Sequence, residues 1–477
     1  MKVSFNTAEM PLPIARCRAC GTGEGKAHCW VDPGTTSSKS LPPLFAYKCE
    51  TCQSVYFDGE DPVLGYENES FSDGYWRHYA QVGAGITAML EPLFALKLDA
   101  DVSLLDVGCG FGYVVDFWNK TQRGNAIGLE TAAYGRIGKS KLNVPIIPAY
   151  LSDAEEIKDS VFDIVYASEV LEHIKAPFEF IKEISTKLSD KGVLVLTTPS
   201  ADAISSENNE SSVIASLSPY FHYFISSENN LVRLLEHAGF SSIRVHNANG
   251  RLFAWASNSS LPELDIGRID WSDYFSYLSL LSQNEDKNVA CGALYRLFKD
   301  ALNTGRVELS RDAFTQLENK AQRCYGLSFQ YPEIQRYLDR QSAVNDLETN
   351  PAWYGCSLLF GGILVGHMLD DRRRKLRLID AGEKILRHEA ASTAFRQFAQ
   401  EAEHFAPYAA GQLVVAAAEF LDQQLQEPAM QKLVGAEASL ESPLRSIGAT
   451  LSRVRKMAPL KHLASRIKSR VKGYLNV

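Results

Sequence analysis

Short apolar runs alternate with amphipathic segments along residues 102–257. The runs cover 102–107, 125–130, 144–150, 161–170, 192–199, 241–247 and 252–257. Most of these runs are separated by segments whose apolar residues recur at helical spacing. One such segment covers 177–192 and predicts a helix that a glycine stops. This alternation predicts an α/β fold built on a parallel sheet. Because only "ANG" lies between the last two runs, they predict an antiparallel hairpin at the sheet edge.

The pattern changes after about residue 260, where apolar residues recur at a helical period. Residues from about 70 to 100 also look helical, whereas residues 1 to about 65 are irregular and rich in cysteine. We therefore expect four parts: a small N-terminal module, an α/β domain, an all-helical domain and a tail. Their expected bounds are 1–65, 66–260, 261–440 and 441–477.

The stretch "SLLDVGCGFGYVVDFW", residues 103–118, is typical of a strand, a tight turn and a helix start. Gly108, Gly110 and Gly112 let the backbone approach a ligand closely, and the amides of the following helix can face that ligand. A dinucleotide site would require its third glycine at position 113, which is Tyr113. The turn therefore indicates a nucleoside-like cofactor without a pyrophosphate.

Three acidic residues accompany this turn. Asp106 lies two positions before the first glycine, Glu130 ends the next run, and Asp153 follows the third. A carboxylate such as Asp106 would repel a pyrophosphate but suits a cationic ligand, and Glu130 can accept both hydroxyls of a ribose. The combination predicts S-adenosylmethionine (SAM) as the cofactor.

The segments "LLDVGCGFG", "GLE", "FDIVYASEVLEHI" and "LSDKGVLVLTTP" occur in the order found in a class I SAM-dependent methyltransferase, which residues 75–260 resemble. The resemblance implies a Rossmann-like, seven-stranded, mostly parallel sheet whose last strand is antiparallel. It also implies roles for site residues. The methionine moiety would be lined by Asp106, Gly108, Gly110 and Gly112. Glu130 would hold the ribose, Asp153 would lie near the adenine, and Ser168 and Glu169 would end the fourth strand on the ligand side.

Methyl transfer to a hydroxyl requires a group that receives its proton. The candidate catalytic residues are His222, in the long connection after the fifth strand, and His173 in "LEHI". His78 and Tyr79 are weaker candidates. Packed, structural histidines remain the alternative for both sites.

The "EVLEH" set resembles a segment of quinone-biosynthesis O-methyltransferases that can hold a divalent metal. Its carboxylates and imidazole in this chain are Glu169, Glu172 and His173. Such groups on one turn are able to bind a cation, so this metal role stays open beside catalysis and packing.

Two cysteine pairs lie in the N-terminal module, in "CRACG" (17–21) and "CETC" (49–52). Two C-x₂-C pairs are typical of a closed zinc site, so Cys17, Cys20, Cys49 and Cys52 predict structural Zn²⁺. His28 and Cys29 are alternative ligands, and reduced or redox-active pairs without metal are the alternative to zinc. A zinc module before such a core resembles sugar methyltransferases of deoxysugar and polysaccharide pathways.

Nine cysteines without a visible secretory signal predict reduced thiols and a cytoplasmic location.

The net charge is −8, although residues 445–477 hold nine Lys and Arg residues and no acid. An acidic body argues against nucleic-acid binding. The basic tail either contacts an anionic membrane surface peripherally or remains solvated or partner-bound. Residues 351–369 carry no charge and predict a buried helix, with a membrane span as the alternative.

We therefore expect a SAM-dependent methyltransferase that acts on a hydroxyl or carbon of a sugar, glycan precursor or similar small metabolite. The expected partner is this small-molecule or glycan acceptor, with no nucleic acid. The alternatives are methylation of a quinone or other aromatic acceptor, and a non-catalytic scaffold that only binds SAM.

Overall fold

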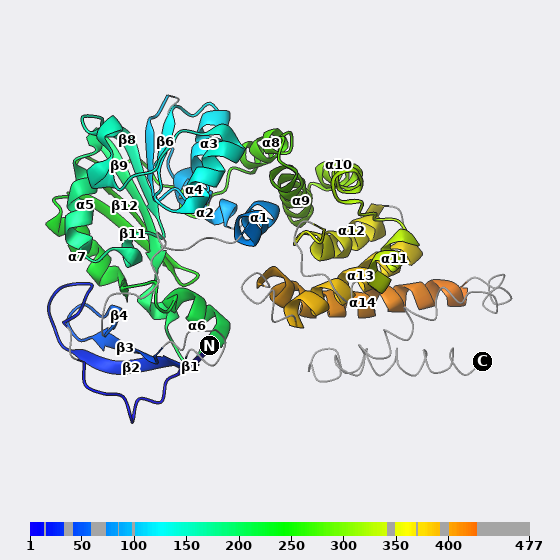
Figure 1. Cartoon of the computed structure of the whole chain (residues 1–477), viewed down its shortest axis with the longest axis horizontal. Helices are drawn as coiled ribbons and strands as arrows, with labels where there is room; N and C mark the ends of the chain where they lie inside the picture. Colours follow the sequence, from blue (N-terminus) through cyan, green and yellow to red (C-terminus); the bar gives the residue numbers. More distant parts are fainter. Residues whose placement is uncertain are drawn as a thin grey trace. The chain divides into compact units, whose positions relative to one another are not determined.

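The computed structural model describes residues 1–13, 16–32, 42–58, 73–83, 85–97, 101–340, 349–368, 371–391 and 400–426. The chain divides into two compact units (Figure 1). One unit comprises Met1–Phe71 and Gly85–Tyr277, and the other comprises Ser72–Ala84 and Leu278–Val477. The four-part division expected from the sequence stays a prediction, and the basic tail at 445–477 lies outside the described residues.

The first unit contains a seven-stranded sheet in the order β11-β12-β9-β8-β5-β6-β7. Strand β12 pairs antiparallel with both β9 and β11, and the other neighbours are parallel. Each apolar run of the sequence supplies one of these strands, so the α/β fold with an antiparallel edge hairpin is confirmed. The strands are β5 (Leu104–Val107), β6 (Ala126–Leu129), β7 (Ile146–Ile147), β8 (Phe162–Ser168), β9 (Leu188–Pro199), β11 (Ser242–Ala248) and β12 (Arg251–Ser257).

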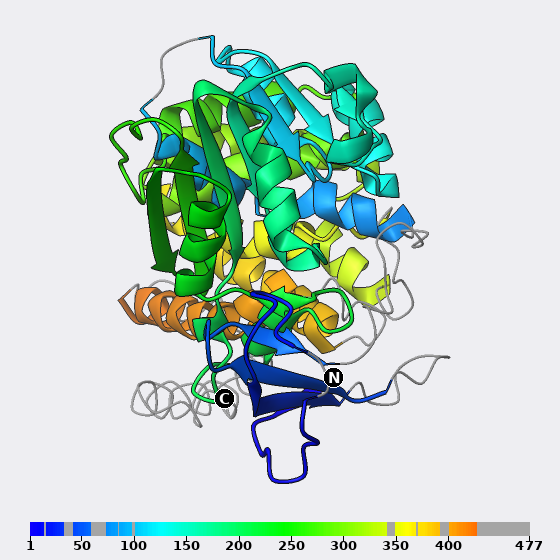
Figure 2. The same ribbon diagram turned by 90° about the vertical axis from the view of Figure 1, so that its left-hand side faces the viewer.

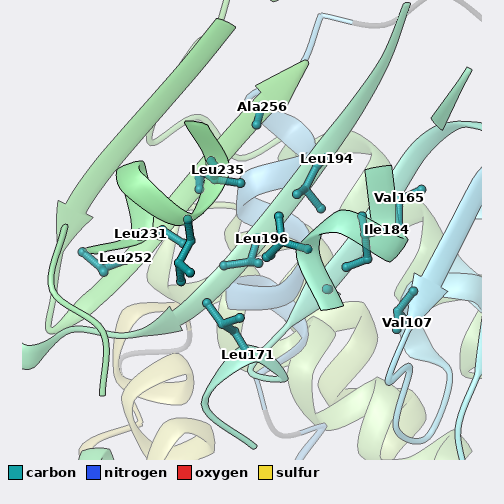
Figure 3. Close-up of a cluster of buried hydrophobic side chains, with 14 of the residues drawn as sticks. Val107, Val165, Leu171, Ile184, Leu194, Leu196, Leu231, Leu235, Leu252 and Ala256 are labelled. Atoms are coloured by element: carbon teal, nitrogen blue, oxygen red, sulfur yellow. The ribbon is translucent and has the colours of Figure 1, made fainter. Parts of the chain in front are cut away.

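Alternate residues of the central strands face opposite helical layers. Leu194, Leu196 and Leu252 belong to one apolar cluster with residues of α5 (Pro177–Ser185) and α7 (Glu228–His237), as Figure 3 shows. On the other face, the Tyr166 hydroxyl and the Trp255 indole donate to backbone carbonyls of α2 (Ile86–Phe94). Helix α3 (Tyr113–Lys120) packs beside α2 on that face (Figure 1). Figure 2 looks onto the opposite face, where α5 lies in front of the strands. The sheet is therefore buried on both faces, as a mostly parallel sheet requires.

Two local expectations need correction. The helix expected over 177–192 ends at Ser185, and β9 begins at Leu188. Gly192 does not stop a helix: a Cβ there would lie 2.9 Å from the Phe162 carbonyl oxygen, where the β8–β9 register shifts. The helical stretch expected over 70–100 is broken between α1 (Asp73–Val82) and α2, because Gly83 and Gly85 both take positive φ.

A second sheet joins the N-terminal segment to the methyltransferase-like core. Its order is β1-β2-β3-β4-β10, and every pairing is antiparallel. The first four strands come from the N-terminal segment, whereas β10 lies between β9 and β11 along the chain. The five are β1 (Lys2–Ser4), β2 (Gly25–Asp32), β3 (Leu44–Cys49), β4 (Val55–Phe57) and β10 (Phe224–Ile225).

The second unit is helical. Within it α1 packs on α9, α9 on α10, α12 on α13 and α13 on α14. Its further helices are α9 (Lys287–Asn303), α10 (Val307–Tyr325), α11 (Glu333–Arg340), α12 (Tyr354–Met368), α13 (Arg372–Ala391) and α14 (Gln400–Gln426), and α8 (Trp271–Leu281) crosses the boundary between the units.

Helix α12 carries the uncharged segment and is buried along most of its length. A Cβ at Gly362 would lie 2.6 Å from Ile379, so this glycine lets α13 approach closely. Among the described residues, no helix has both the length and the apolarity needed to cross a membrane.

Candidate functional site

The glycine turn lies between β5 and α3, at the carboxyl end of the central strand. Gly108, Gly110 and Gly112 have φ values of 73°, 57° and 89°, which favour glycine over residues with a Cβ. A Cβ at Gly108 would also lie 2.6 Å from Val170, which follows β8. The turn thus needs glycine for its backbone conformation and for its contact with the segment after β8.

Glu130 braces this turn from the end of β6. One carboxylate oxygen accepts the Gly110 N–H at 3.0 Å, and the other accepts the Ala132 N–H at 2.8 Å. Asp106 is 2% exposed, and its Oδ2 accepts no hydrogen bond from the described residues. Burial raises the pKa of both carboxyls, and Glu130 raises that of Asp106 further. A buried carboxylate oxygen normally has a partner, so this pair suits a ligand that supplies donors or positive charge.

The other expected cofactor residues lie in different surroundings. Asp153 is exposed at the end of a short helical turn, where it accepts a hydrogen bond from Ser152. Ser168 ends β8 and Glu169 follows it, and both hydrogen-bond to Thr197 of the adjacent strand β9. Glu169 has a φ of 56°, a strained backbone conformation of the kind that gathers at functional sites.

Sequence reasoning missed three residues that support this edge of the sheet. Thr197 and Thr198 end β9, and the Thr198 hydroxyl donates to Glu172 at 2.9 Å. The Arg251 guanidinium lies 3.3 Å from the Glu169 carboxylate. In the sequence, Thr197 and Thr198 could have been identified as two polar residues near the end of an apolar run.

A cluster of three potential ligands lies after β8, and we call Glu172, His173 and His222 the Glu–His–His cluster. Glu172 and His173 belong to a single 3₁₀ turn, Leu171–His173, whereas His222 precedes β10. One nitrogen or oxygen of each residue lies within 4.8 Å of the others. The two imidazole centroids are 4.6 Å apart, and Glu172 Oε1 lies 4.0 Å from His222 Nε2.

Burial sets the charges of this cluster. Glu172 is 1% exposed and His222 is 6% exposed. Burial lowers the pKa of His173 to about 4. The pKa of His222 lies well below its usual range, mainly because the side chain is buried and to a smaller extent because His173 is close to it. Burial and nearby Glu169 raise the pKa of Glu172. Both imidazoles are therefore neutral near pH 7 and keep a nitrogen lone pair. The weaker candidates His78 and Tyr79 belong to the helical unit.

The four cysteines expected to bind metal form the four-cysteine cluster: Cys17, Cys20, Cys49 and Cys52. Their sulfurs lie within 4.8 Å of one another, with 3.7 Å between Cys17 and Cys52 and 3.9 Å between Cys20 and Cys49. The alternative ligands point to other partners: His28 bonds to the Ile204 carbonyl, and Cys29 packs in a separate apolar cluster.

The two cysteine pairs have the same backbone shape. The Gly21 N–H bonds to the Cys17 carbonyl at 2.8 Å, and the Gln53 N–H bonds to the Cys49 carbonyl at 2.9 Å. Gly21 and Gln53 both take positive φ, at 70° and 63°. Each pair is thus a tight turn that presents two sulfurs on one side.

A comparison with protein families agrees with this geometry. Residues 75–245 match a family model described as a methyltransferase domain. This part of the chain is a SAM-dependent methyltransferase domain. The matched range runs through the glycine turn, the seven-stranded sheet up to its edge hairpin, and the Glu–His–His cluster.

Curated relatives are similar to about a third of the chain. The tRNA U34 carboxymethyltransferase of Mannheimia succiniciproducens is 27% identical over 181 residues, which are 34% of this chain and 54% of that protein. The protein of the same name from Actinobacillus succinogenes is 28% identical over the same shares. The chain thus spans about half the length of these relatives.

Solved structures of methyltransferases are similar at low identity. The plantazolicin methyltransferase BpumL in complex with SAH is 13% identical with a TM-score of 0.29, covering 41% of this chain and 88% of that one. A possible histamine N-methyltransferase from Thermotoga maritima is 16% identical with a TM-score of 0.32, covering 41% and 98%.

The relatives correct one expectation from the sequence. We expected a small-molecule or glycan acceptor and no nucleic acid, but the relatives are named for the U34 of tRNA. The expectation of no nucleic acid rested on the acidic body of the chain, and the expectation of a sugar or glycan acceptor rested on the resemblance to sugar methyltransferases. Net charge governs solubility and non-specific association, and it does not determine which acceptor a catalytic site takes.

Proposed function

We propose that this chain binds SAM at the glycine turn and transfers its methyl group to an acceptor hydroxyl. The observation that carries the proposal is the turn itself, with Glu130 bonded to the Gly110 N–H and Asp106 buried beside it. SAM carries an ammonium and a sulfonium, so it supplies the positive charge and donors that Asp106 lacks. Asp153, Ser168 and Glu169 are the further cofactor residues of the proposal.

The reaction is an in-line displacement. The acceptor oxygen forms a bond to the methyl carbon, the carbon–sulfur bond breaks, and sulfur keeps the electron pair of that bond. The acceptor loses its hydroxyl proton. Because charge is dispersed during this step, alignment and exclusion of water are the main tasks of the protein.

We further propose His222 and His173 as the catalytic residues on the acceptor side. Val170 touches Gly108 and lies two positions before Glu172, so the Glu–His–His cluster belongs to the segment that contacts the glycine turn. Neutral imidazoles next to a transfer site are suited to holding the acceptor hydroxyl and to accepting its proton.

A structural Zn²⁺ in the four-cysteine cluster is also part of the proposal. Four sulfurs at about 2.3 Å from zinc form a tetrahedron with edges of about 3.8 Å. The sulfur separations of 3.7 and 3.9 Å fit that edge. Such a closed site stabilises a small module and leaves no open position for substrate.

Calorimetric titration with SAM tests the cofactor site. We expect binding by the wild-type chain and at least tenfold weaker binding by Glu130→Gln, because a charge-assisted hydrogen bond contributes about 1.5–3 kcal/mol. Glu155→Gln is the matched control, since this exposed glutamate pairs with Lys158. Equal affinity of wild type and Glu130→Gln for SAM would contradict the proposed site.

The acceptor is tested with labelled SAM. The relatives' names make total tRNA the first acceptor to assay, followed by a small-molecule extract of the source cells. Mass spectrometry of the product identifies the methylated acceptor and the position of the added methyl group. SAM binding without transfer to any fraction would instead favour the non-catalytic scaffold.

A further inference from the structure

We propose that the Glu–His–His cluster is a binding site for one divalent cation, with Glu172, His173 and His222 as its ligands. The cation's use in methyl transfer rests on the proposed function, but its binding does not. The site differs from the set suggested by the "EVLEH" segment, because the structure groups His222 with Glu172 and His173.

The carboxylate of Glu172 is the first observation. Its Oε2 accepts the Thr198 hydroxyl at 2.9 Å, but its Oε1 accepts no hydrogen bond from the described residues. The carboxylate is almost fully buried. Buried carboxylates are normally paired with a cation or coordinate a metal.

Among the described residues, no arginine or lysine lies within ion-pair distance of Glu172, although the more distant charge of Arg251 lowers the pKa of its carboxyl somewhat. Arg251, the basic residue at this edge of the sheet, contacts Glu169. Within the described part of the chain, the imidazole that faces Glu172 is that of His222, whose neutral Nε2 lies 4.0 Å from Oε1. This separation is too long for a hydrogen bond. An ion held at about 2.1 Å by both atoms needs them roughly 3 to 4 Å apart.

The orientation of His173 is the second observation. Its Nδ1 lies 3.1 Å from the Phe221 carbonyl oxygen. A carbonyl only accepts, so the proton lies on Nδ1 and the lone pair lies on Nε2. A backbone carbonyl on one nitrogen is the usual way in which a protein orients a metal-binding imidazole. The Thr198 hydroxyl orients Glu172 in the same way.

The backbone around His222 is the third observation. Ser218 and Tyr220 take positive φ values of 35° and 72° in the turn that leads to this histidine. Strained conformations of non-glycine residues persist where surrounding contacts hold them. The Tyr223 N–H bonds to the Glu172 carbonyl at 2.8 Å, which ties the turn to the other two ligands.

Two imidazole nitrogens and one carboxylate oxygen suit a borderline cation such as Zn²⁺ or Mn²⁺. Three protein ligands leave at least one coordination position open. A water or hydroxyl oxygen bound there would have a lowered pKa. This is the property that a hydroxyl acceptor beside the glycine turn requires. With the cation bound, His173 and His222 would act as its ligands, and the hydroxyl would release its proton to water instead of to an imidazole.

Manganese binding tests the site. The full-length protein is dialysed against a mild chelator and titrated with Mn²⁺, and free Mn²⁺ is followed by electron paramagnetic resonance. We expect one Mn²⁺ per chain for wild type and at least tenfold weaker binding for Glu172→Gln and His222→Ala. His237→Ala is the matched control, because His237 is an exposed histidine of α7 outside the cluster.

The controls separate a lost site from a lost fold. Circular dichroism and calorimetric SAM titration of each variant report folding, and Glu172→Gln keeps the side-chain shape if His222→Ala does not fold. Absence of Mn²⁺ binding by wild type, together with no zinc beyond one per chain, would overturn the site. Equal Mn²⁺ binding by all variants would also overturn it. A wild type that binds Mn²⁺ but not SAM would overturn the proposed function and leave the cation site standing.

Discussion

The four-cysteine cluster and the Glu–His–His cluster each gather potential metal ligands within 4.8 Å, but they are built differently. The first joins two short turns of the same shape, each fixed by a backbone hydrogen bond next to its cysteines. The second joins a 3₁₀ turn after β8 to a histidine that precedes β10. Equal spacing of ligands therefore arises from local turns in one cluster and from packing of distant segments in the other.

The chemistry of the two clusters differs as well. Four thiolates form a closed set that suits structural zinc. Two imidazoles and a carboxylate leave coordination positions open, and their segment contacts the glycine turn through Val170. A closed set of four sulfurs is suited to stabilising the fold. A set with open coordination positions beside a cofactor turn is suited to binding a reactant.

The two clusters are nevertheless connected through residues 223–227. At one end of this segment, the Tyr223 N–H bonds to the Glu172 carbonyl. Strand β10 then pairs with β4, and the Ser227 hydroxyl donates to the Cys52 carbonyl. A change at the cysteines can therefore reach the segment that carries His222.

The largest expected effect comes from Cys17→Ser combined with Cys52→Ser. Structural zinc contributes on the order of 10 kcal/mol in small zinc-dependent modules. We expect this variant to lose its zinc and the cooperative unfolding of the N-terminal sheet, measured by elemental analysis and thermal unfolding. Cys29→Ala, a buried cysteine outside the cluster, should keep zinc and lose only about 1 kcal/mol. Full zinc content in the double variant would show that the four cysteines do not hold the metal.

The next effect is a pH dependence of the Glu–His–His cluster. The pKa of His173 is lowered to about 4, below its unfolded value of 6.5. The unfolded chain binds the proton first, so stability is complete above pH 6.5 and is lost as pH falls from 6.5 to 4. After a discount for the partial exposure of His173, we expect about 2 kcal/mol.

Urea unfolding without Mn²⁺ measures this dependence. Wild type should lose about 2 kcal/mol more than His173→Gln between pH 7 and pH 4.5. His237→Gln should follow wild type. Parallel pH profiles of wild type and His173→Gln would show that burial does not affect this imidazole.

A smaller effect is expected at the connection between the clusters. Ser227 caps α7 by accepting the Asn230 N–H, and its hydroxyl bonds to Cys52. Ser227→Ala should cost about 1–2 kcal/mol in urea unfolding. It should also speed hydrogen exchange in β10. Asn209→Ala removes a comparable cap from α6 (Glu210–Leu217) and should leave exchange in β10 unchanged.

The smallest effect is expected for Thr198→Val, which removes the hydroxyl that orients Glu172. We expect a loss of about 1 kcal/mol in stability and about tenfold weaker Mn²⁺ binding. The exposed Thr186→Val is the control and should change neither quantity. If Thr198→Val leaves Mn²⁺ affinity at the wild-type value, the hydroxyl does not position the carboxylate.

Local patterns in the sequence were sufficient for the main fold. The alternation of apolar runs identified the seven strands of the sheet, because the central strands are buried on both faces and read as apolar runs. The same reasoning misplaced the start of β9. Residues 188–191 have the composition of a helix end, but the strand already begins at Leu188, which pairs with Phe162 of β8. Strand β10 was missed because two residues carry no periodic signal.

The sequence alone determined the features that depend on neighbours along the chain: the glycine turn with its acidic companions, and the two C-x₂-C pairs. Their geometry is set by short-range backbone conformation, which residue spacing records directly. Only the tertiary structure decided that His222 joins Glu172 and His173, that Thr198 orients Glu172, and that β10 completes the N-terminal sheet. These contacts depend on how segments that are far apart in the sequence pack together, and the spacing of residues along the chain does not record how close such segments lie in space.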